Sequence, residues 1–229
     1  MVVTLSQQNE KLCVGVLALQ GAFIEHVHIL KRLPEVAEAI LVRTQEQLES
    51  VDALIIPGGE STAMALIAER CGLFEPLRKF TRSKPTWGTC AGMILLANEA
   101  SKTKKGGQQL LGGLDIAVNR NQFGSQVDSF ETDLHMSAVL GESAPPFHAV
   151  FIRAPIVTAL NSEDVQVLAK LEHQVGQTDT ETIVAVRQGH LMATAFHPEL
   201  TPDDRLHSYF VRLAQDYKGK SQDVVTMAN

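Results

Sequence analysis

The chain has 229 residues, of which 45% are hydrophobic and 20% are charged, and its formal net charge is -6 at pH 7. These values suit a soluble globular protein with one large α/β domain, or at most two small ones. No basic face is evident, which argues against nucleic-acid binding, and the apolar run at 14–19 is too short to span a membrane.

The first half of the chain alternates short apolar runs, typical of strands, with segments that have apolar residues at helical spacing. This alternation predicts a mostly parallel sheet covered by helices on both faces. In chain order we expect a strand at 13–19, a helix at 22–33 ended by Pro34, strands at 38–43 and 52–57, helices at 61–72 and 74–82, a strand at 85–89 and a helix at 91–100.

Beyond Gly106 the pattern changes to short strand candidates in close succession, which favours antiparallel additions to the sheet. A last helix is expected at about 203–217. We find no linker or repeat, so we expect a single domain over 1–229, with residues 1–10 and the tail after about 218 loose. The strand candidates are 114–120, 127–134, 148–155, 165–171, 182–189 and 191–198.

The three cysteines, Cys13, Cys71 and Cys90, are too few and too scattered for a disulfide framework, so reduced thiols in the cytoplasm are the simpler interpretation. None forms a C-x-x-C pair, which leaves little support for redox or metal chemistry. Cys13 lies inside a predicted strand and Cys71 at a predicted helix end, so we expect packing roles for both.

Cys90 is different, because it lies in the pattern G-x-C-x-G between a predicted strand and a predicted helix. This is the thiol counterpart of the strand–turn–helix elbow that exposes a serine nucleophile. A helix N-terminus also stabilises a thiolate, and the Ala91 amide would point toward a developing oxyanion. The alternative is a small cysteine packed in a core turn.

A cysteine nucleophile needs a base, and the base needs an orienting group. His197 follows an apolar strand, and Glu199 comes two residues later, so in an extended segment both side chains would face the same way. The other histidines have no carboxylate in a suggestive frame. His26 and His28 lie two apart on a predicted helix, so they point to different faces and form no metal pair.

The third element is Pro57-Gly58-Gly59 between a predicted strand and a predicted helix. Two glycines let the backbone turn its amides toward a ligand, while Ser61 is expected to cap the helix. In open α/β sheets the ligand crevice lies at the carboxyl ends of the strands, where Pro57, Cys90 and His197 all fall.

From about Val14 to Lys218 the sequence resembles class I glutamine amidotransferases, through G-x-C-x-G and H-P-E. The segments LALQG, QVDSFE and FIRAP are similar to one branch, the glutaminase subunits of pyridoxal phosphate synthase (the PdxT/SNO family). The polar loop at 173–181 is longer than that family usually carries, and we assign it no role.

This resemblance implies hydrolysis of L-glutamine to glutamate and ammonia through a γ-glutamyl thioester, without a cofactor or a metal. It assigns Cys90 as nucleophile, His197 as acid and base, and Glu199 as the orienting group, with Gly59 and Ala91 amides holding the oxyanion. The positions that match substrate contacts in the family are Gly58, Gly59, Glu60, Ser61, Ala91, Arg120, Ile152 and Arg153.

The resemblance also implies that the ammonia passes to a synthase partner, which we expect to dock near LALQG and the first helix. Arg153, in an otherwise apolar predicted strand, is a candidate for binding an anionic substrate group or for an internal salt bridge. Three other functions stay open at this point: an amidotransferase of purine, tryptophan or histidine synthesis, a non-catalytic regulatory subunit, and a thiol hydrolase or stress protein that shares the elbow.

Overall fold

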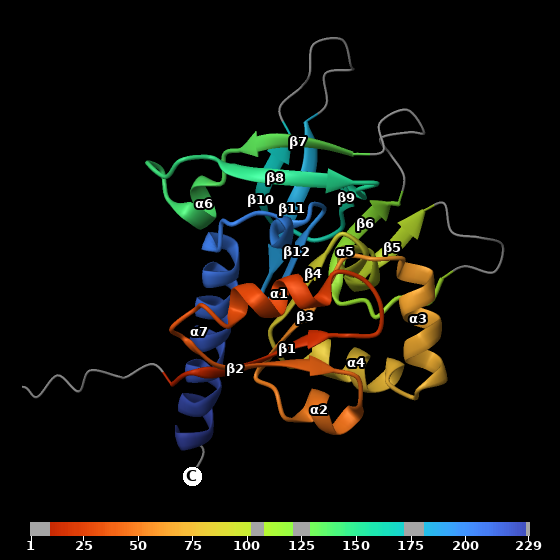
Figure 1. Cartoon of the computed structure of the whole chain (residues 1–229), viewed down its shortest axis with the longest axis vertical. Coiled ribbons are helices and arrows are strands. Elements are labelled where there is room, and N and C mark those ends of the chain that lie inside the picture. Colours follow the sequence, from red (N-terminus) through yellow and green to blue (C-terminus); the bar gives the residue numbers. More distant parts are fainter. Residues whose placement is uncertain (1–9, 102–107, 121–128, 172–180, 228–229) are drawn as a thin grey trace, which may run out of the picture.

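Figure 1 shows the fold, a computed structural model of the chain. It describes residues 10–101, 108–120, 129–171 and 181–227. Several sequence expectations therefore fall outside the described residues: the loose segment up to residue 9, the start of the strand expected at 127–134, and the polar loop from 173 to 180.

The centre of the fold is a parallel sheet built by strands from the first half of the chain. Strands β1 (Leu12–Leu17), β2 (Val36–Val42), β3 (Ala53–Ile56) and β4 (Thr86–Thr89) pair in the order β2-β1-β3-β4, all parallel. A further parallel partner, β12 (Leu191–Thr194), comes from near the end of the chain and pairs with β4. This pairing brings two distant parts of the sequence to neighbouring strands.

The second half of the chain extends this sheet, mainly with antiparallel strands. Beyond β12 follow β11 (Thr182–Gln188), β9 (Ile156–Leu160), β6 (Leu114–Asn119) and β5 (Ala97–Ser101), while β10 (Gln166–Leu171) pairs with β11. Strands β7 (Ser129–Leu134) and β8 (Phe147–Ile152) form a separate ribbon across the top of the sheet in Figure 1. The predicted fold class, a mostly parallel α/β sheet with antiparallel additions, is confirmed.

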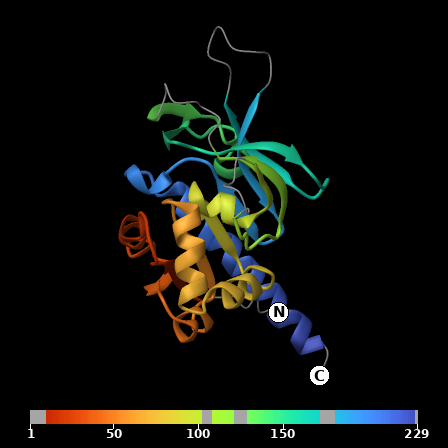
Figure 2. The same cartoon turned by 90° about the vertical axis from the view of Figure 1, so that its right-hand side faces the viewer.

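Helices cover both faces of the sheet (Figures 1 and 2). On one face, α1 (Phe23–Leu30) lies beside α7 (Arg205–Met227), with His26 in contact with His207. Helices α3 (Ser61–Arg70) and α4 (Phe74–Thr81) lie on the other face, as right-handed crossovers would place them, and there α4 packs on α2 (Gln45–Glu49) and α3 on α5 (Ala91–Leu96). The short α6 (Ser137–Leu140) packs on α7. Of the helices in the described ranges, none is long and apolar enough to cross a membrane.

The prediction of one helix over 91–100 is wrong in its second part. Helix α5 ends at Leu96, and Ala97–Ser101 forms β5, paired in parallel with β6. The amides of Leu111 and Gly112 both donate to the Leu95 carbonyl at the end of the helix, at 2.8 and 3.1 Å. Tertiary pairing therefore overrides the helical propensity of the alanines.

In the segment after about 218, which we expect to be loose, the backbone continues helix α7 to Met227: no proline interrupts it, and the Lys218 ammonium is held by Glu10 and Asp52. Two other local predictions need correction. The strand expected at 148–155 ends at Ile152, and β9 follows from Ile156. Cys71 is exposed rather than packed, since it is the C-cap residue of α3.

Candidate active site

Three neighbouring parallel strands end at one edge of the sheet and carry the predicted motifs. Strand β3 ends just before Pro57, β4 ends just before Cys90, and β12 ends three residues before His197. Because β3, β4 and β12 are adjacent and parallel, their carboxyl ends share one edge. The prediction that these motifs converge there is confirmed, and this edge is where open α/β sheets form ligand crevices.

Cys90 lies at a strained turn between β4 and α5. Its φ of 47° lies in the region that favours glycine, and such strain in a non-glycine residue is characteristic of functional sites. The glycines of G-x-C-x-G allow the tight packing beneath it. A Cβ on Gly88 would lie 2.4 Å from the Gly92 carbonyl oxygen, and one on Gly92 would lie 2.1 Å from the Ile56 oxygen. The elbow therefore needs both glycines for close approach.

The Cys90 thiol faces His197. Cys90 is 6% exposed and His197 7% exposed, so both lie just below the surface. Burial alone would lower the pKa of His197, but hydrogen bonding to Cys90 and Glu199 and the negative charge of both raise it to about 10. A ring with that pKa is protonated at neutral pH, so it carries a positive charge beside the sulfur that it faces.

Glu199 holds the far side of the His197 ring. Its Oε1 accepts a hydrogen bond from Nδ1 at 2.7 Å, and the Glu199 side chain is fully buried. The predicted contact is confirmed, but the reason given for it was wrong. Residues Pro198–Leu200 form a short 3₁₀ helix with His197 as its N-cap, so the two side chains meet across a helical turn and not along a strand.

The Gly58-Gly59 loop lies against these side chains. A Cβ on Gly58 would lie 2.3 Å from Cε1 of His197 and 3.3 Å from Cβ of Cys90. The Gly58 carbonyl accepts a hydrogen bond from the Ala22 amide at 3.1 Å. The side-chain oxygen of Gln20 accepts one from the Glu60 amide at 2.8 Å. The loop that follows β1 therefore fixes the backbone beside the nucleophile.

Glu60, and not Ser61, caps helix α3. Both Glu60 carboxylate oxygens accept backbone hydrogen bonds, from the amides of Thr62 and Ala63 at 3.1 and 2.7 Å. Ser61 is the first helical residue, is buried, and donates to Gln108 at 3.1 Å. Arg120 donates to Glu60 at 3.1 Å, so these two predicted substrate contacts lie together. The expected Ser61 cap is wrong because the longer Glu60 side chain reaches both amides.

Ile152 and Arg153 approach the nucleophile from the separate ribbon. The Cys90 thiol points to the Ile152 carbonyl, 3.9 Å away. Arg153 was expected within a strand, but β8 ends at Ile152 and Arg153 is exposed, with a φ of 45°. Cys90 and Arg153 are the only non-glycine residues with positive φ in the described ranges. Strain therefore concentrates at this one site.

The sequence patterns missed two buried histidines behind the site. His26 of α1 lies with Nε2 3.4 Å from Oε2 of Glu199, and its Nδ1 lies 2.8 Å from Nε2 of His207 on α7. Neither residue is near the other motifs in sequence. The sequence offers only a weak signal for these two histidines: each is a polar residue with apolar neighbours on its helix.

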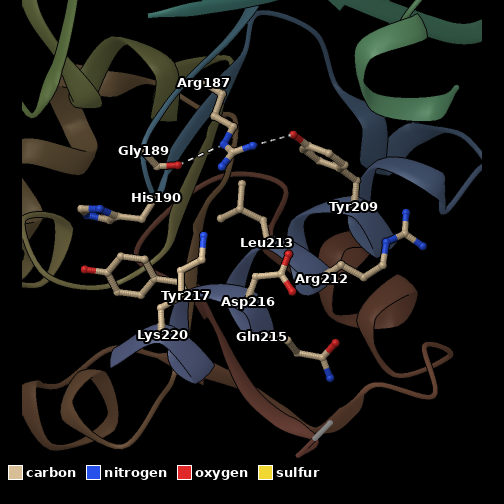
Figure 3. Close-up of a pocket in the computed structure, with 10 residues that line it drawn as sticks. All are labelled: Arg187, Gly189, His190, Tyr209, Arg212, Leu213, Gln215, Asp216, Tyr217 and Lys220. Atoms are coloured by element: carbon tan, nitrogen blue, oxygen red, sulfur yellow. Dashed lines mark hydrogen bonds between the residues drawn. The ribbon is translucent and has the colours of Figure 1, made fainter. Parts of the chain in front are cut away.

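Figure 3 shows a pocket at the opposite edge of the sheet, with a volume of about 440 Å³. It is bordered by the turn at Gly189 and His190, which precedes β12, and by the middle of α7. Its Arg187 donates to the Gly189 carbonyl at 3.0 Å and to the Tyr209 hydroxyl at 3.3 Å. None of the predicted site residues lines it. The predicted catalytic chemistry is therefore assigned to the edge of the sheet that carries Cys90, and not to this pocket.

Comparisons with known proteins show which family the chain resembles. Residues 16–216 match the model of the SNO glutamine amidotransferase family. The chain is 47% identical over 222 residues to a probable pyridoxal 5'-phosphate synthase subunit PDX2 of Arabidopsis thaliana, covering 89% of this chain and 86% of that one. It is 53% identical over 201 residues to the pyridoxal 5'-phosphate synthase subunit PdxT of Herpetosiphon aurantiacus, covering 87% and 99%. A crystal structure of a glutamine amidotransferase superposes with a TM-score of 0.75 at 48% identity, covering 88% and 98%.

Proposed function

The chain belongs to the SNO glutamine amidotransferase family, and we propose that it hydrolyses L-glutamine to L-glutamate and ammonia for pyridoxal phosphate synthesis. The observation that carries the proposal is the succession of contacts between three side chains: the Cys90 thiol faces His197, and His197 bonds Glu199 at 2.7 Å. Relatives at about half identity are named as pyridoxal 5'-phosphate synthase subunits, which supports the same pathway.

In the first half-reaction the Cys90 thiolate attacks the side-chain amide carbon of glutamine. A carbon–sulfur bond forms, and the carbonyl electron pair moves to oxygen, where the backbone amides of Gly59 and Ala91 stabilise it. The Ala91 amide is free for this role because the first amides of a helix have no partner within that helix. The oxyanion then collapses, the carbon–nitrogen bond breaks, and His197 gives its proton to the departing ammonia.

In the second half-reaction the thioester is hydrolysed. His197, now neutral, takes a proton from water as that water attacks the thioester carbon, and the carbon–sulfur bond breaks to release glutamate. The thiolate and the imidazolium are thereby restored. Glu199 keeps the Nδ1 proton of His197 in place through both steps, so that Nε2 is the atom that exchanges protons.

The charged ends of glutamine need partners of opposite sign. We assign Arg120 and Arg153 to the α-carboxylate and Glu60 to the α-ammonium group, because Arg120 and Glu60 already lie together near Gly59. Gly58, Ser61 and the Ile152 backbone complete the walls of the site. In the free chain Arg120 and Glu60 form an ion pair with each other. When glutamine binds, each would exchange that ion pair for one with the substrate.

We also place this chain in a cytoplasmic complex with a synthase subunit that takes up the ammonia. The docking surface assigned here is the exposed side of α1, including Ile24, His28 and Lys31. Replacing His28 and Lys31 with glutamate should weaken stimulation of glutamine hydrolysis by the synthase and leave the basal rate unchanged. Equal stimulation of this variant and the unmodified chain would contradict the assignment.

The test of the function is glutamate release from glutamine, measured with and without the synthase. Cys90→Ala should abolish release, with circular dichroism showing an unchanged fold. If Cys90→Ala released glutamate at the unmodified rate, the nucleophile would be wrong. If the unmodified chain bound the synthase but released no glutamate, it would be a regulatory subunit. Stimulation by the synthase of another pathway, and not by that of pyridoxal phosphate, would contradict the pathway.

A further inference from the structure

Behind the proposed triad lies a polar cluster closed off from solvent. His26 and His207 are both 0% exposed, and they come from α1 and α7, which flank the sheet on the same face. Trp87 of β4 packs edge-on against both rings, with centroid distances of 5.9 Å to His26 and 4.9 Å to His207. Two imidazoles buried this deeply need hydrogen bonds to offset their desolvation.

The hydrogen bonds available to these rings define one direction of donation. Nε2 of His26 lies 3.4 Å from both Glu199 Oε2 and the Thr89 hydroxyl, and its Nδ1 lies 2.8 Å from Nε2 of His207. A bare ring nitrogen facing a carboxylate oxygen would be repelled, so Nε2 of His26 carries the proton. Burial lowers the pKa of His26 to about 3 despite the nearby Glu199, so the ring is neutral and its Nδ1 is an acceptor.

The donor to that acceptor is therefore Nε2 of His207. Burial lowers the pKa of His207 to about 3 as well, so its other nitrogen, Nδ1, is unprotonated. Nδ1 of His207 is buried and has no hydrogen-bond partner in the described part of the chain. An unpaired acceptor there is easier to tolerate than an unpaired N–H. The reverse direction would leave a buried N–H of His207 unpaired and set a lone pair of His26 against Glu199.

We infer that His26 and His207 are positioning residues of the glutaminase centre: His207 holds His26, and Nε2 of His26 faces the Glu199 carboxylate, which orients His197, from 3.4 Å. This inference rests on the proposed function. Oε2 of Glu199 makes no hydrogen bond within the described residues, and the Nε2 proton of His26, 3.4 Å away, is the polar group that faces it. Without His26 the carboxylate could rotate, and the 2.7 Å bond to His197 would lose its fixed direction.

The same cluster lies next to the nucleophile. Thr89, whose hydroxyl shares the Nε2 proton of His26, is the last residue of β4 and precedes Cys90 directly. The titratable groups that face Glu199 among the described residues are His197 and His26. Cys90 lies beyond His197, His207 lies beyond His26, and the charge of Arg32 acts on His207. Removing the two buried rings changes the surroundings of Glu199 without touching Cys90 or His197.

The test uses four variants assayed with the synthase present. His26→Leu and the double variant His26→Leu/His207→Leu remove the N–H that faces Glu199. The double variant also removes the His207 ring that would be left unpaired, which keeps folding favourable. His26→Gln restores an N–H near the position of Nε2. His190→Leu is the matched control, since His190 is a half-buried histidine bonded to the Thr81 carbonyl at the opposite edge of the sheet.

We expect both leucine variants to lower kcat by about tenfold to a hundredfold, the range produced by small misplacements of catalytic groups, with KM for glutamine within about twofold. The alkaline limb of kcat/KM should move to lower pH, because a less firmly held Glu199 would contribute less to the raised pKa of His197. His26→Gln should recover most of kcat, and His190→Leu should match the unmodified chain in both kcat and pH profile.

The outcomes separate this inference from the proposed function. If the unmodified chain hydrolyses glutamine and Cys90→Ala does not, the proposed function stands whatever the histidine variants do. A folded double variant with unmodified kcat and an unmoved alkaline limb would overturn the positioning role. So would a loss of activity in His26→Leu that only follows a loss of thermal stability and is equal in His26→Gln.

Discussion

Gly58 packs its α-carbon against the ring of His197, so closely that a Cβ at Gly58 would lie 2.3 Å from Cε1. The position of the ring is also fixed by Glu199, whose carboxylate bonds its Nδ1 at 2.7 Å. The backbone of the loop after β3 is therefore one wall of the proton-transfer site, and its second glycine, Gly59, follows at the entrance. Close backbone approach explains why a side chain is excluded here.

Gly58→Ala should accordingly inactivate the enzyme while leaving it folded. We expect kcat for glutamine to fall at least about a hundredfold, because the methyl group displaces either His197 or the loop. The free energy of unfolding should fall by about 1–3 kcal/mol, as in other overpacked sites. Gly219→Ala is the control, since its Cβ would meet open space on α7. Normal kcat in Gly58→Ala would mean that the ring and loop are farther apart in the working enzyme.

Gln20 should matter through the backbone that it holds. Its side-chain oxygen accepts from the Glu60 amide and would lie 2.4 Å from a Cβ on Gly59. Gln20→Met keeps the volume but removes the acceptor, so we expect kcat to fall by about tenfold to a hundredfold, less than the full loss of an oxyanion donor. Steady-state kinetics with Gln45→Met, an exposed glutamine on α2, as control would measure this. A change confined to KM would instead assign Gln20 to substrate binding.

Arg120 provides a test of substrate recognition. If it binds the α-carboxylate of glutamine, Arg120→Gln should raise KM by about tenfold or more, the value of one charge-assisted hydrogen bond, with kcat nearly unchanged. The matched control is Arg78→Gln, which removes an arginine paired with Glu75 on α4. An unchanged KM would restrict Arg120 to its structural bond with Glu60.

The triad could be predicted from the sequence because each member lies in a short local pattern at the end of a strand. Parallel pairing of β3, β4 and β12 then brings those ends together, whatever the details of the loops. The local conformation was less predictable. His197 and Glu199 meet across a 3₁₀ turn, and Arg153 lies beyond its strand with positive φ, because both depend on contacts with the separate ribbon and the loop after β12.

The histidine chain could not be predicted, for a physical reason. His26 and His207 are separated by 181 positions, and each is an isolated polar residue on the buried side of a helix. Only the packing of α1 against α7 over Trp87 gives them partners. In the same way, Ala97–Ser101 has helix-forming alanines but lies beside β6, whose hydrogen bonds determine its conformation.

The raised pKa of His197 leads to a prediction about the reactivity of Cys90. Below a pH of about 10 the His197 ring is protonated, and its positive charge, which favours a negative sulfur beside it, is lost as the pH rises through about 10. An ordinary thiol, with a pKa of about 8.5, carries little thiolate at pH 6.5. We therefore expect iodoacetamide to modify Cys90 at pH 6.5 at least about tenfold faster than exposed Cys71. The rate of Cys90 modification should stay nearly constant up to pH 9. Peptide mass spectrometry would measure both rates. Burial raises the pKa of Cys13, which should react last.

In His197→Asn the preference for Cys90 should disappear; if it persisted, the helix N-terminus and not the imidazolium would stabilise the thiolate.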